Sequence, residues 1–275
     1  MKSENEHSES RLQKQNKKLL WKILLIICIV GLLVCTGLLI GKQMGKHKAQ
    51  QDMADLTTEY TEAADTQEPP TEEQKNTICG IEIPEKQLDW GTIQKENPDI
   101  YAWIYIPGTE VDYPVLQHST DNSYYLNHNI DGSSGYPGCI YTENVNTKTF
   151  EDPNTVLYGH DMKDGSMFAS LHNYRDPEFF QNNPYVFVYT PTETRVYEIY
   201  EACEFSDVHL FYEYDFTDPA DYGRFLTDIA GVREMDTQIR RDMTVTTEEK
   251  VLTMSTCIAT KPNNRYLVIA VQLHD

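Results

Sequence analysis

The sequence predicts an all-β dominated domain: a closed barrel of eight short strands, with one helix before it and a longer helix ahead of the penultimate strand. The strand-like runs are short and mostly bounded by Gly, Pro, Asn or Asp, and helical patterns between them are few. About 190 residues remain for this domain, enough for a single core. One transmembrane helix is expected to precede it.

The first eighty residues are unlike a packed domain. Ile23 to Ile40 is an uncharged, mostly apolar run, about 27 Å long as a helix and so close to the thickness of a bilayer's hydrocarbon core. A cleaved signal peptide is the alternative, but no small-residue cleavage site follows the run. We therefore expect a basic cytoplasmic tail at 1–22, a single-pass anchor in membrane lipid at 23–41 and an acidic extracellular spacer at 42–80.

Charge indicates the orientation and limits the partners. Six Lys or Arg residues precede the apolar run and three follow it, which favours a cytoplasmic N-terminus. The globular domain at 81–275 would then lie outside the cell. The net charge is -20, and such acidity argues against nucleic acid as a partner because its phosphates would be repelled.

The globular domain begins with a predicted helix over 84–97, in which Leu88, Trp90 and Ile93 are candidate packing residues before Pro98. Eight strands follow, expected at 101–106, 113–116, 138–141, 155–159, 185–189, 195–205, 251–256 and 265–273.

The longer helix lies between the sixth and seventh strands. Asp218 can cap it, and Pro219 suits its first turn. Its buried face is expected to consist of apolar residues spaced by three and four: Tyr222, Phe225, Leu226 and Ile229.

The last two strands end in chemically reactive residues. Pro262-Asn263-Asn264 separates a run ending at Cys257 from one beginning at Arg265. If the runs pair as a hairpin, with neighbouring strands about 4.8 Å apart, Cys257 and Arg265 face one another across its open end.

The other cysteines have simpler interpretations. Those in the apolar run, Cys28 and Cys35, suit packing. No C-x-x-C pair or zinc-type spacing occurs, so no metal site is predicted. A disulfide among Cys79, Cys139 and Cys203 remains possible outside the cell.

Two segments resemble the sortases, cysteine transpeptidases that attach proteins to the Gram-positive cell wall. Thr253-Met254-Ser255-Thr256-Cys257 is similar to their Thr-Leu-x-Thr-Cys signature, and Arg265 falls where their arginine does. The segment 155–168, with Tyr-Gly-His at 158–160, resembles the histidine region of class B. Tyr-Pro-Val-Leu-Gln at 113–117 and Tyr-Leu-Asn at 125–127 are further similarities to class B. The resemblance implies the same barrel fold.

The resemblance also implies roles for three residues. Cys257 would be the nucleophile, since a nearby imidazolium and guanidinium favour the thiolate; inert packing is the alternative for a lone Cys at a strand end. His160 would be the general acid and then the general base. Arg265 would stabilise the oxyanion or bind the substrate's carbonyl groups.

Substrate contacts are expected from three further residues. Asn127 matches a class B asparagine, although it also suits a turn. Ser255 and Thr253 alternate onto the strand face of Cys257, and Thr256 points away. Tyr158 and Asp161 are interpreted as packing and solvent-exposed neighbours of His160, and His118, His128, His172 and His209 as surface or loop residues.

The resemblance implies a membrane-anchored class B sortase without cofactor or metal. It would cleave a C-terminal sorting motif of secreted proteins after its Thr, forming a thioacyl enzyme, and transfer the protein to an amine of a lipid II-type cell-wall precursor or of another protein. The segment 207–214 and the helix that follows it are expected to read the motif. Two alternatives remain open: an inactive tethered peptide-binding barrel, and a cysteine peptidase or transpeptidase acting on peptidoglycan stem peptides.

Overall fold

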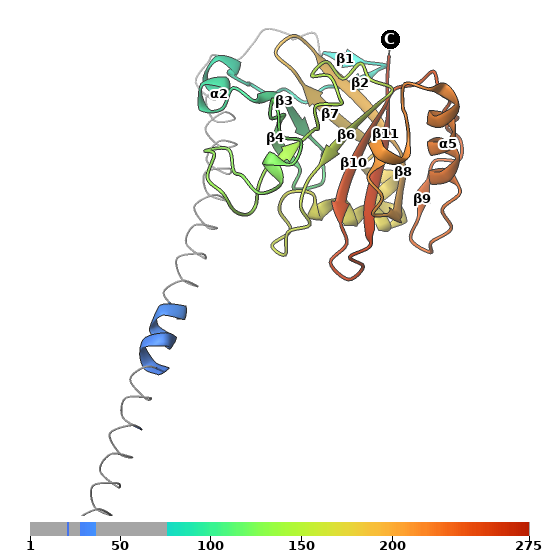
Figure 1. Cartoon of the computed structure of the whole chain (residues 1–275). Coiled ribbons are helices and arrows are strands. Elements are labelled where there is room, and N and C mark those ends of the chain that lie inside the picture. The colour runs from blue at the N-terminus through green and yellow to red at the C-terminus, as the bar shows by residue number, and fades with distance from the viewer. Residues whose placement is uncertain (1–20, 22–27, 37–75, 275) are drawn as a thin grey trace, which may run out of the picture. The chain divides into compact units, whose positions relative to one another are not determined.

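The computed structural model of the chain describes Trp21, residues 28–36 and residues 76–274 (Figure 1). Two compact units are distinguished, Met1–Lys48 and Ala49–Asp275. In the first unit residues 28–36 are helical. No helix in the described part of the chain is both long and apolar enough to cross a membrane. Apart from Trp21, the tail predicted at 1–22 lies outside the described residues, as do residues 23–27 and 37–41 of the predicted anchor and residues 42–75 of the predicted spacer.

Eight strands close into a mixed barrel, in the order β11-β10-β6-β5-β4-β3-β7-β8, with β8 pairing back onto β11 (Figure 1). β4 and β5 are parallel, as are β6 and β10, and the other pairs are antiparallel. The strands are β3 (Ile100–Tyr105), β4 (Asp112–Leu116), β5 (Ile140–Tyr141), β6 (Asn154–Tyr158), β7 (Tyr185–Tyr189), β8 (Thr194–Ser206), β10 (Val251–Cys257) and β11 (Asn264–Gln272). The predicted barrel of eight strands is confirmed.

Three further strands of two residues each were not predicted, because a pair of residues is too short to show alternation. β9 (Gln238–Ile239) adds to the outer edge of β8, and β1 (Thr77–Ile78) pairs with β2 (Ile81–Glu82) as a separate hairpin.

Both predicted helices exist. α5 (Pro219–Ala230) is capped by Asp218, whose carboxylate accepts from the Ala220 amide, and its predicted face is buried. α2 (Trp90–Glu96) begins six residues later than predicted, because Asp89 caps it by accepting from the Thr92 amide. The remaining helical segments are η1 (Tyr124–Leu126), η2 (Ala169–Arg175), α3 (Pro177–Asn182) and α4 (Leu210–Glu213).

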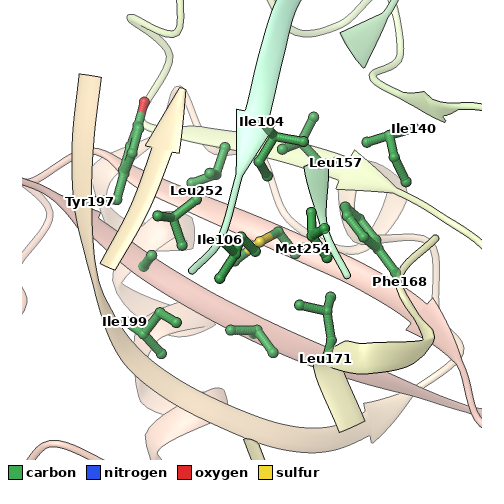
Figure 2. Packing of buried hydrophobic residues seen from close by; sticks show 14 of the residues in the cluster. Ile104, Ile106, Ile140, Leu157, Phe168, Leu171, Tyr197, Ile199, Leu252 and Met254 are labelled. Carbon is green, nitrogen blue, oxygen red and sulfur yellow. The ribbon is translucent and has the colours of Figure 1, made fainter. Parts of the chain in front are cut away.

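The barrel interior is filled by alternate residues of the strands (Figure 2). Leu252 and Met254 of β10 and Leu157 of β6 point inward and are fully buried. Alternation therefore turns Ser255 and Cys257 to the outer face of the barrel wall. Met254, in place of the commoner Leu, fills an interior position where an unbranched side chain adapts to its neighbours.

A second apolar layer covers the outer face of β6, β10 and β11. Helix α5 and the segment 210–216 lie against this side of the barrel (Figure 1). Phe216 packs edge-on against Phe225, with ring centroids 5.2 Å apart, and both belong to one cluster with Val156, Leu267 and Ile269. This layer stops short of the Cys257 end of β10, so a depression remains there.

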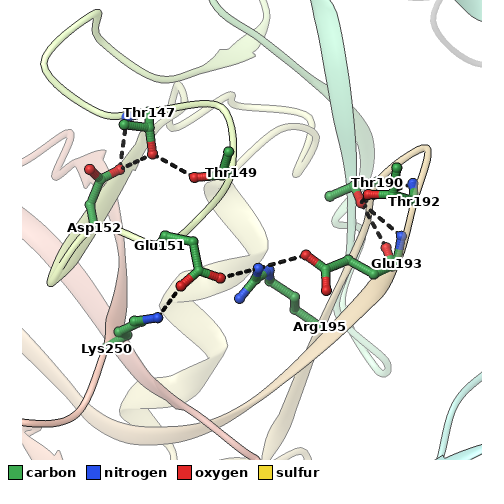
Figure 3. Close-up of polar contacts among 9 residues, drawn as sticks. All are labelled: Thr147, Thr149, Glu151, Asp152, Thr190, Thr192, Glu193, Arg195 and Lys250. Atoms are coloured by element: carbon green, nitrogen blue, oxygen red, sulfur yellow. Dashed lines mark hydrogen bonds and ion pairs between the residues drawn. The ribbon is translucent and has the colours of Figure 1, made fainter.

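Charged side chains close the end of the barrel opposite to Cys257 (Figure 3). Arg195, at the start of β8, is buried and forms ion pairs with Glu193 and Glu151, and Glu151 also pairs with Lys250 just before β10. The Lys250 ammonium and the Arg195 guanidinium hold the pKa of Glu151 below its usual value. These ion pairs connect three segments of the chain at this end of the barrel.

Glu201 is a fully buried carboxyl group on β8, between Ile239 of β9 and Ile269 of β11. Burial raises its pKa to about 7, although the neighbouring Cys203 thiol and two arginines favour the carboxylate. The folded protein therefore holds a proton on Glu201 at pH values where an unfolded chain does not.

We expect this proton to make stability pH-dependent. From about pH 4.5 to pH 7 the folded state binds more protons at Glu201 than the unfolded state, so the free energy of unfolding falls as pH rises, by on the order of 3 kcal/mol in total. Glu201→Gln removes this pH dependence. Urea unfolding of both proteins across that range should therefore show the free energy of unfolding of the variant rising relative to that of the wild type as pH increases. Parallel profiles would contradict the assignment.

Candidate functional site

Three strand ends meet at one edge of the barrel wall. β6 and β10 run parallel with Tyr158 opposite Ser255, and the Gly159 amide donates to the Ser255 carbonyl at 3.2 Å. In the antiparallel pair β10 and β11, Cys257 lies opposite Arg265, as the hairpin prediction required.

These strand ends open into one pocket of about 610 Å³. His160, Cys257, Arg265 and Ser255 all line it. The rest of the wall comes from the 121–126 segment, from β5 and the residues around it, and from the segment 206–212. Residues as far apart in the sequence as Asp121 and Leu267 thus surround one space.

Cys257 is exposed, whereas the six preceding residues of β10 are buried. Cys257 lines the pocket, and its carbonyl oxygen lies 3.1 Å from His172 Nε2. The nucleophile candidate is therefore accessible at the point where the strand leaves the barrel.

His160 is oriented by a backbone contact. Its Nε2 lies 2.6 Å from the Leu126 carbonyl oxygen, which can only accept, so Nε2 carries a proton. In the neutral ring Nδ1 is then the nitrogen that can accept a proton. The Tyr136 ring lies beside the imidazole, with centroids 4.9 Å apart.

The β10–β11 turn holds the Arg265 guanidinium. Nη1 donates to the carbonyl oxygens of Pro262 and Asn264, at 3.1 and 3.0 Å. Among the described residues no carboxylate forms an ion pair with Arg265, in contrast to Arg175, Arg195, Arg224 and Arg240. Its positive charge is left for an anionic or carbonyl group in the pocket.

The three residues expected to contact the substrate lie in different environments. Ser255 lines the pocket beside Cys257. Thr253 is on the same strand face but is fully buried, and its hydroxyl donates to Asn154 Oδ1 at 2.8 Å. Asn127 is exposed at the end of η1 and does not line the pocket, whereas Asn122 does.

No feature of the sequence indicated the polar contact between His209 and Glu143 on the opposite wall. His209 Nε2 lies 2.8 Å from Glu143 Oε1, and the exposed Tyr212 ring stacks on the imidazole at 4.1 Å. His209 was interpreted only as a surface or loop residue, and Glu143 was not singled out. The described residues hold no cluster of three His, Cys, Asp or Glu side chains suited to a metal ion.

Burial separates Cys257 from the other reactive groups of the pocket. Cys139 also lines the pocket but is only 1% exposed, and burial raises the pKa of its thiol. Burial likewise raises the pKa of the Tyr141 and Tyr158 phenols, so both remain neutral. Cys139 and Cys203 are free thiols, which excludes a disulfide among the three candidate cysteines.

Comparison with known proteins identifies the family. The sortase domain model matches residues 104–273. Sortase B of Listeria monocytogenes is 32% identical over 238 residues, covering 85% of this chain and 88% of that protein. Sortase B of Staphylococcus aureus is 28% identical over 166 residues, covering 60% of this chain and 66% of that protein.

Solved structures give the same result. Sortase B of Bacillus anthracis, in complex with AAEK1, superimposes with a TM-score of 0.64 at 28% identity, covering 84% of this chain and 99% of that one. A substrate complex of S. aureus sortase B gives a TM-score of 0.58 at 27% identity, covering 67% and 84%. The chain therefore belongs to the sortase family of cysteine transpeptidases, within class B.

Proposed function

We propose that this protein is a membrane-anchored sortase that cleaves a C-terminal sorting motif after its Thr and transfers the secreted protein to an amine. The observation that carries the proposal is the convergence around one pocket of an exposed thiol at Cys257, an oriented imidazole at His160 and the Arg265 guanidinium, which no described carboxylate pairs with. The solved S. aureus sortase B–substrate complex supports substrate binding by a chain of this fold.

In the first half-reaction the Cys257 thiolate attacks the carbonyl carbon of the motif's Thr. The oxyanion that forms is stabilised by the Arg265 guanidinium. The C–N bond then breaks, and His160, an imidazolium that holds on Nδ1 the proton lost by the Cys257 thiol, donates that proton to the leaving amine. The product is a thioacyl enzyme at Cys257.

In the second half-reaction an acceptor amine attacks the thioester. His160, neutral after the first step, takes the proton of the incoming amine through Nδ1, and the Cys257 thiolate leaves. The acceptor we propose is an amine of a lipid II-type cell-wall precursor or of another protein. Ser255 and the segment 207–212 line the same pocket and are placed to contact the motif.

The proposed location is the outer face of the cell membrane. We propose a cytoplasmic tail at 1–22, an anchor at 23–41, a spacer at 42–80 and an extracellular catalytic domain at 81–275. The apolar side chains of the described helix at 28–36 are exposed, as those of a lipid-facing helix would be.

The proposal is tested by trapping the thioacyl enzyme. The full chain, in detergent and without added amine, is incubated with a library of peptides that vary around a sorting motif. We expect an adduct of the mass of the peptide up to its Thr, mapped to Cys257 by mass spectrometry. Cleavage of stem peptides with no adduct from any motif peptide would favour the peptidoglycan alternative, and binding without cleavage would favour the inactive barrel.

A further inference from the structure

Two titratable side chains contact the Cys257 segment without lining the pocket: Asp161 and His172. Asp161 follows His160 directly, and its Oδ2 accepts from the Ala259 amide at 3.3 Å. The same oxygen lies 3.5 Å from His172 Nε2, and that nitrogen lies 3.1 Å from the Cys257 carbonyl oxygen. The two side chains thus connect the His160 loop with the main chain on both sides of Ile258.

The contacts fix the form of the His172 ring. The Cys257 carbonyl can only accept, so His172 Nε2 must carry a proton. Nδ1 in turn lies 3.5 Å from the Nε–H of Arg175 and accepts from it. His172 thus carries a proton on Nε2, the nitrogen that donates toward the nucleophile's main chain.

His172 is itself held in place. Arg175 forms ion pairs with Glu204 and Asp236, and its guanidinium lies 4.6 Å from the centroid of the Tyr266 ring. The His172 ring lies 4.9 Å from the same tyrosine ring. The donor that contacts Cys257 is thus attached to the barrel through β8 and β11.

Such support matters because Cys257 is the last residue of its strand. The β10 ladder with β11 ends at the Cys257–Arg265 pair, and the chain beyond it is a turn. An attacking sulfur must lie within about 3–3.5 Å of the carbonyl carbon, and a displacement of about 1 Å can cost on the order of a hundredfold in rate.

We propose that Asp161 and His172 are positioning residues, which hold the main chain at Cys257 and Ala259 in register with His160. The inference rests on the proposed role of Cys257 as nucleophile. It corrects the sequence interpretation of Asp161 as a solvent-exposed neighbour and of His172 as a surface residue, since their side chains are only 18% and 21% exposed and contact the nucleophile's segment.

The kinetic test compares truncating with conservative variants of the full chain. Asp161→Ala and His172→Leu should lower kcat by about 10- to 100-fold with little change in KM for the motif peptide. Asp161→Asn keeps an acceptor for the Ala259 amide, and His172→Gln keeps a donor for the Cys257 carbonyl, so both should recover most of the loss. Asp164→Ala, a carboxylate in the same loop that binds Ser166, is the control and should retain wild-type kcat.

A second measurement is independent of turnover. Hydrogen exchange at the Ala259 amide should be slow in the wild type and in Asp161→Asn, and fast in Asp161→Ala. Truncating variants with wild-type kcat, conservative variants as impaired as the truncations, or an unprotected Ala259 amide in the wild type would each overturn the proposal. A wild type that forms no thioacyl adduct would instead refute the proposed function and leave the exchange result to stand alone.

Discussion

Cys257→Ala is expected to abolish thioacyl formation and to lower turnover of a sorting-motif peptide by at least about a thousandfold, because no other nucleophile replaces the thiolate. Peptide binding should survive, since the substituted atom is a single sulfur at the rim of the pocket. Turnover followed by mass spectrometry, together with peptide affinity by fluorescence anisotropy, measures the two effects separately.

Cys139→Ala provides the matched control. Cys139 lines the same pocket, but it is buried and its thiol pKa is raised, so it stays protonated and unreactive. Iodoacetamide should therefore label Cys257 before Cys139, and Cys139→Ala should keep most of the activity. Equal losses in the two variants, or full turnover in Cys257→Ala, would remove Cys257 from the mechanism.

The strands that carry this site could be predicted because their signals are local. The run ending at Cys257 is apolar and β-branched, and Pro262 breaks it before Arg265, which was enough to predict the hairpin and the facing pair. Alternation along β10 also placed Ser255 and Cys257 on one face.

How deeply each residue of that face is buried could not be predicted from the sequence. Thr253 shares the face of Cys257, but the outer layer that includes Leu226 and Ile229 of α5 covers its end of β10, so its hydroxyl bonds to Asn154 instead of lining the pocket. How far such a layer extends depends on tertiary packing, and the alternation of residues along a strand carries no information about it.

The segment 207–214, which was expected to read the motif, supplies part of the opposite wall, but the individual side chains there were not predicted, for a related reason. Asn122, Glu143 and His209 come from three separate segments, and none has a distinctive neighbour in the sequence. Their proximity depends on how loops fold over the barrel edge. The resemblance drew attention to Asn127, five residues beyond the asparagine that lines the pocket.

The two ring nitrogens of His160 have different functions: Nε2 donates to the Leu126 carbonyl, and Nδ1 is available for proton transfer. His160→Gln can keep the donor through its side-chain amide but supplies no base. We expect it to lose about as much kcat as His160→Ala, on the order of 10²- to 10⁴-fold, with the KM of the motif peptide little changed.

His128→Gln is the matched control, because the His128 ring also contacts a backbone carbonyl, that of Tyr124, at 2.8 Å, yet lies outside the pocket. It should keep near-wild-type turnover. Added imidazole should partly restore His160→Ala, whose missing ring leaves space beside Tyr136. A His160→Gln enzyme with wild-type kcat would mean that the ring serves only to hold Leu126, and that proton transfer to the leaving amine depends on another group.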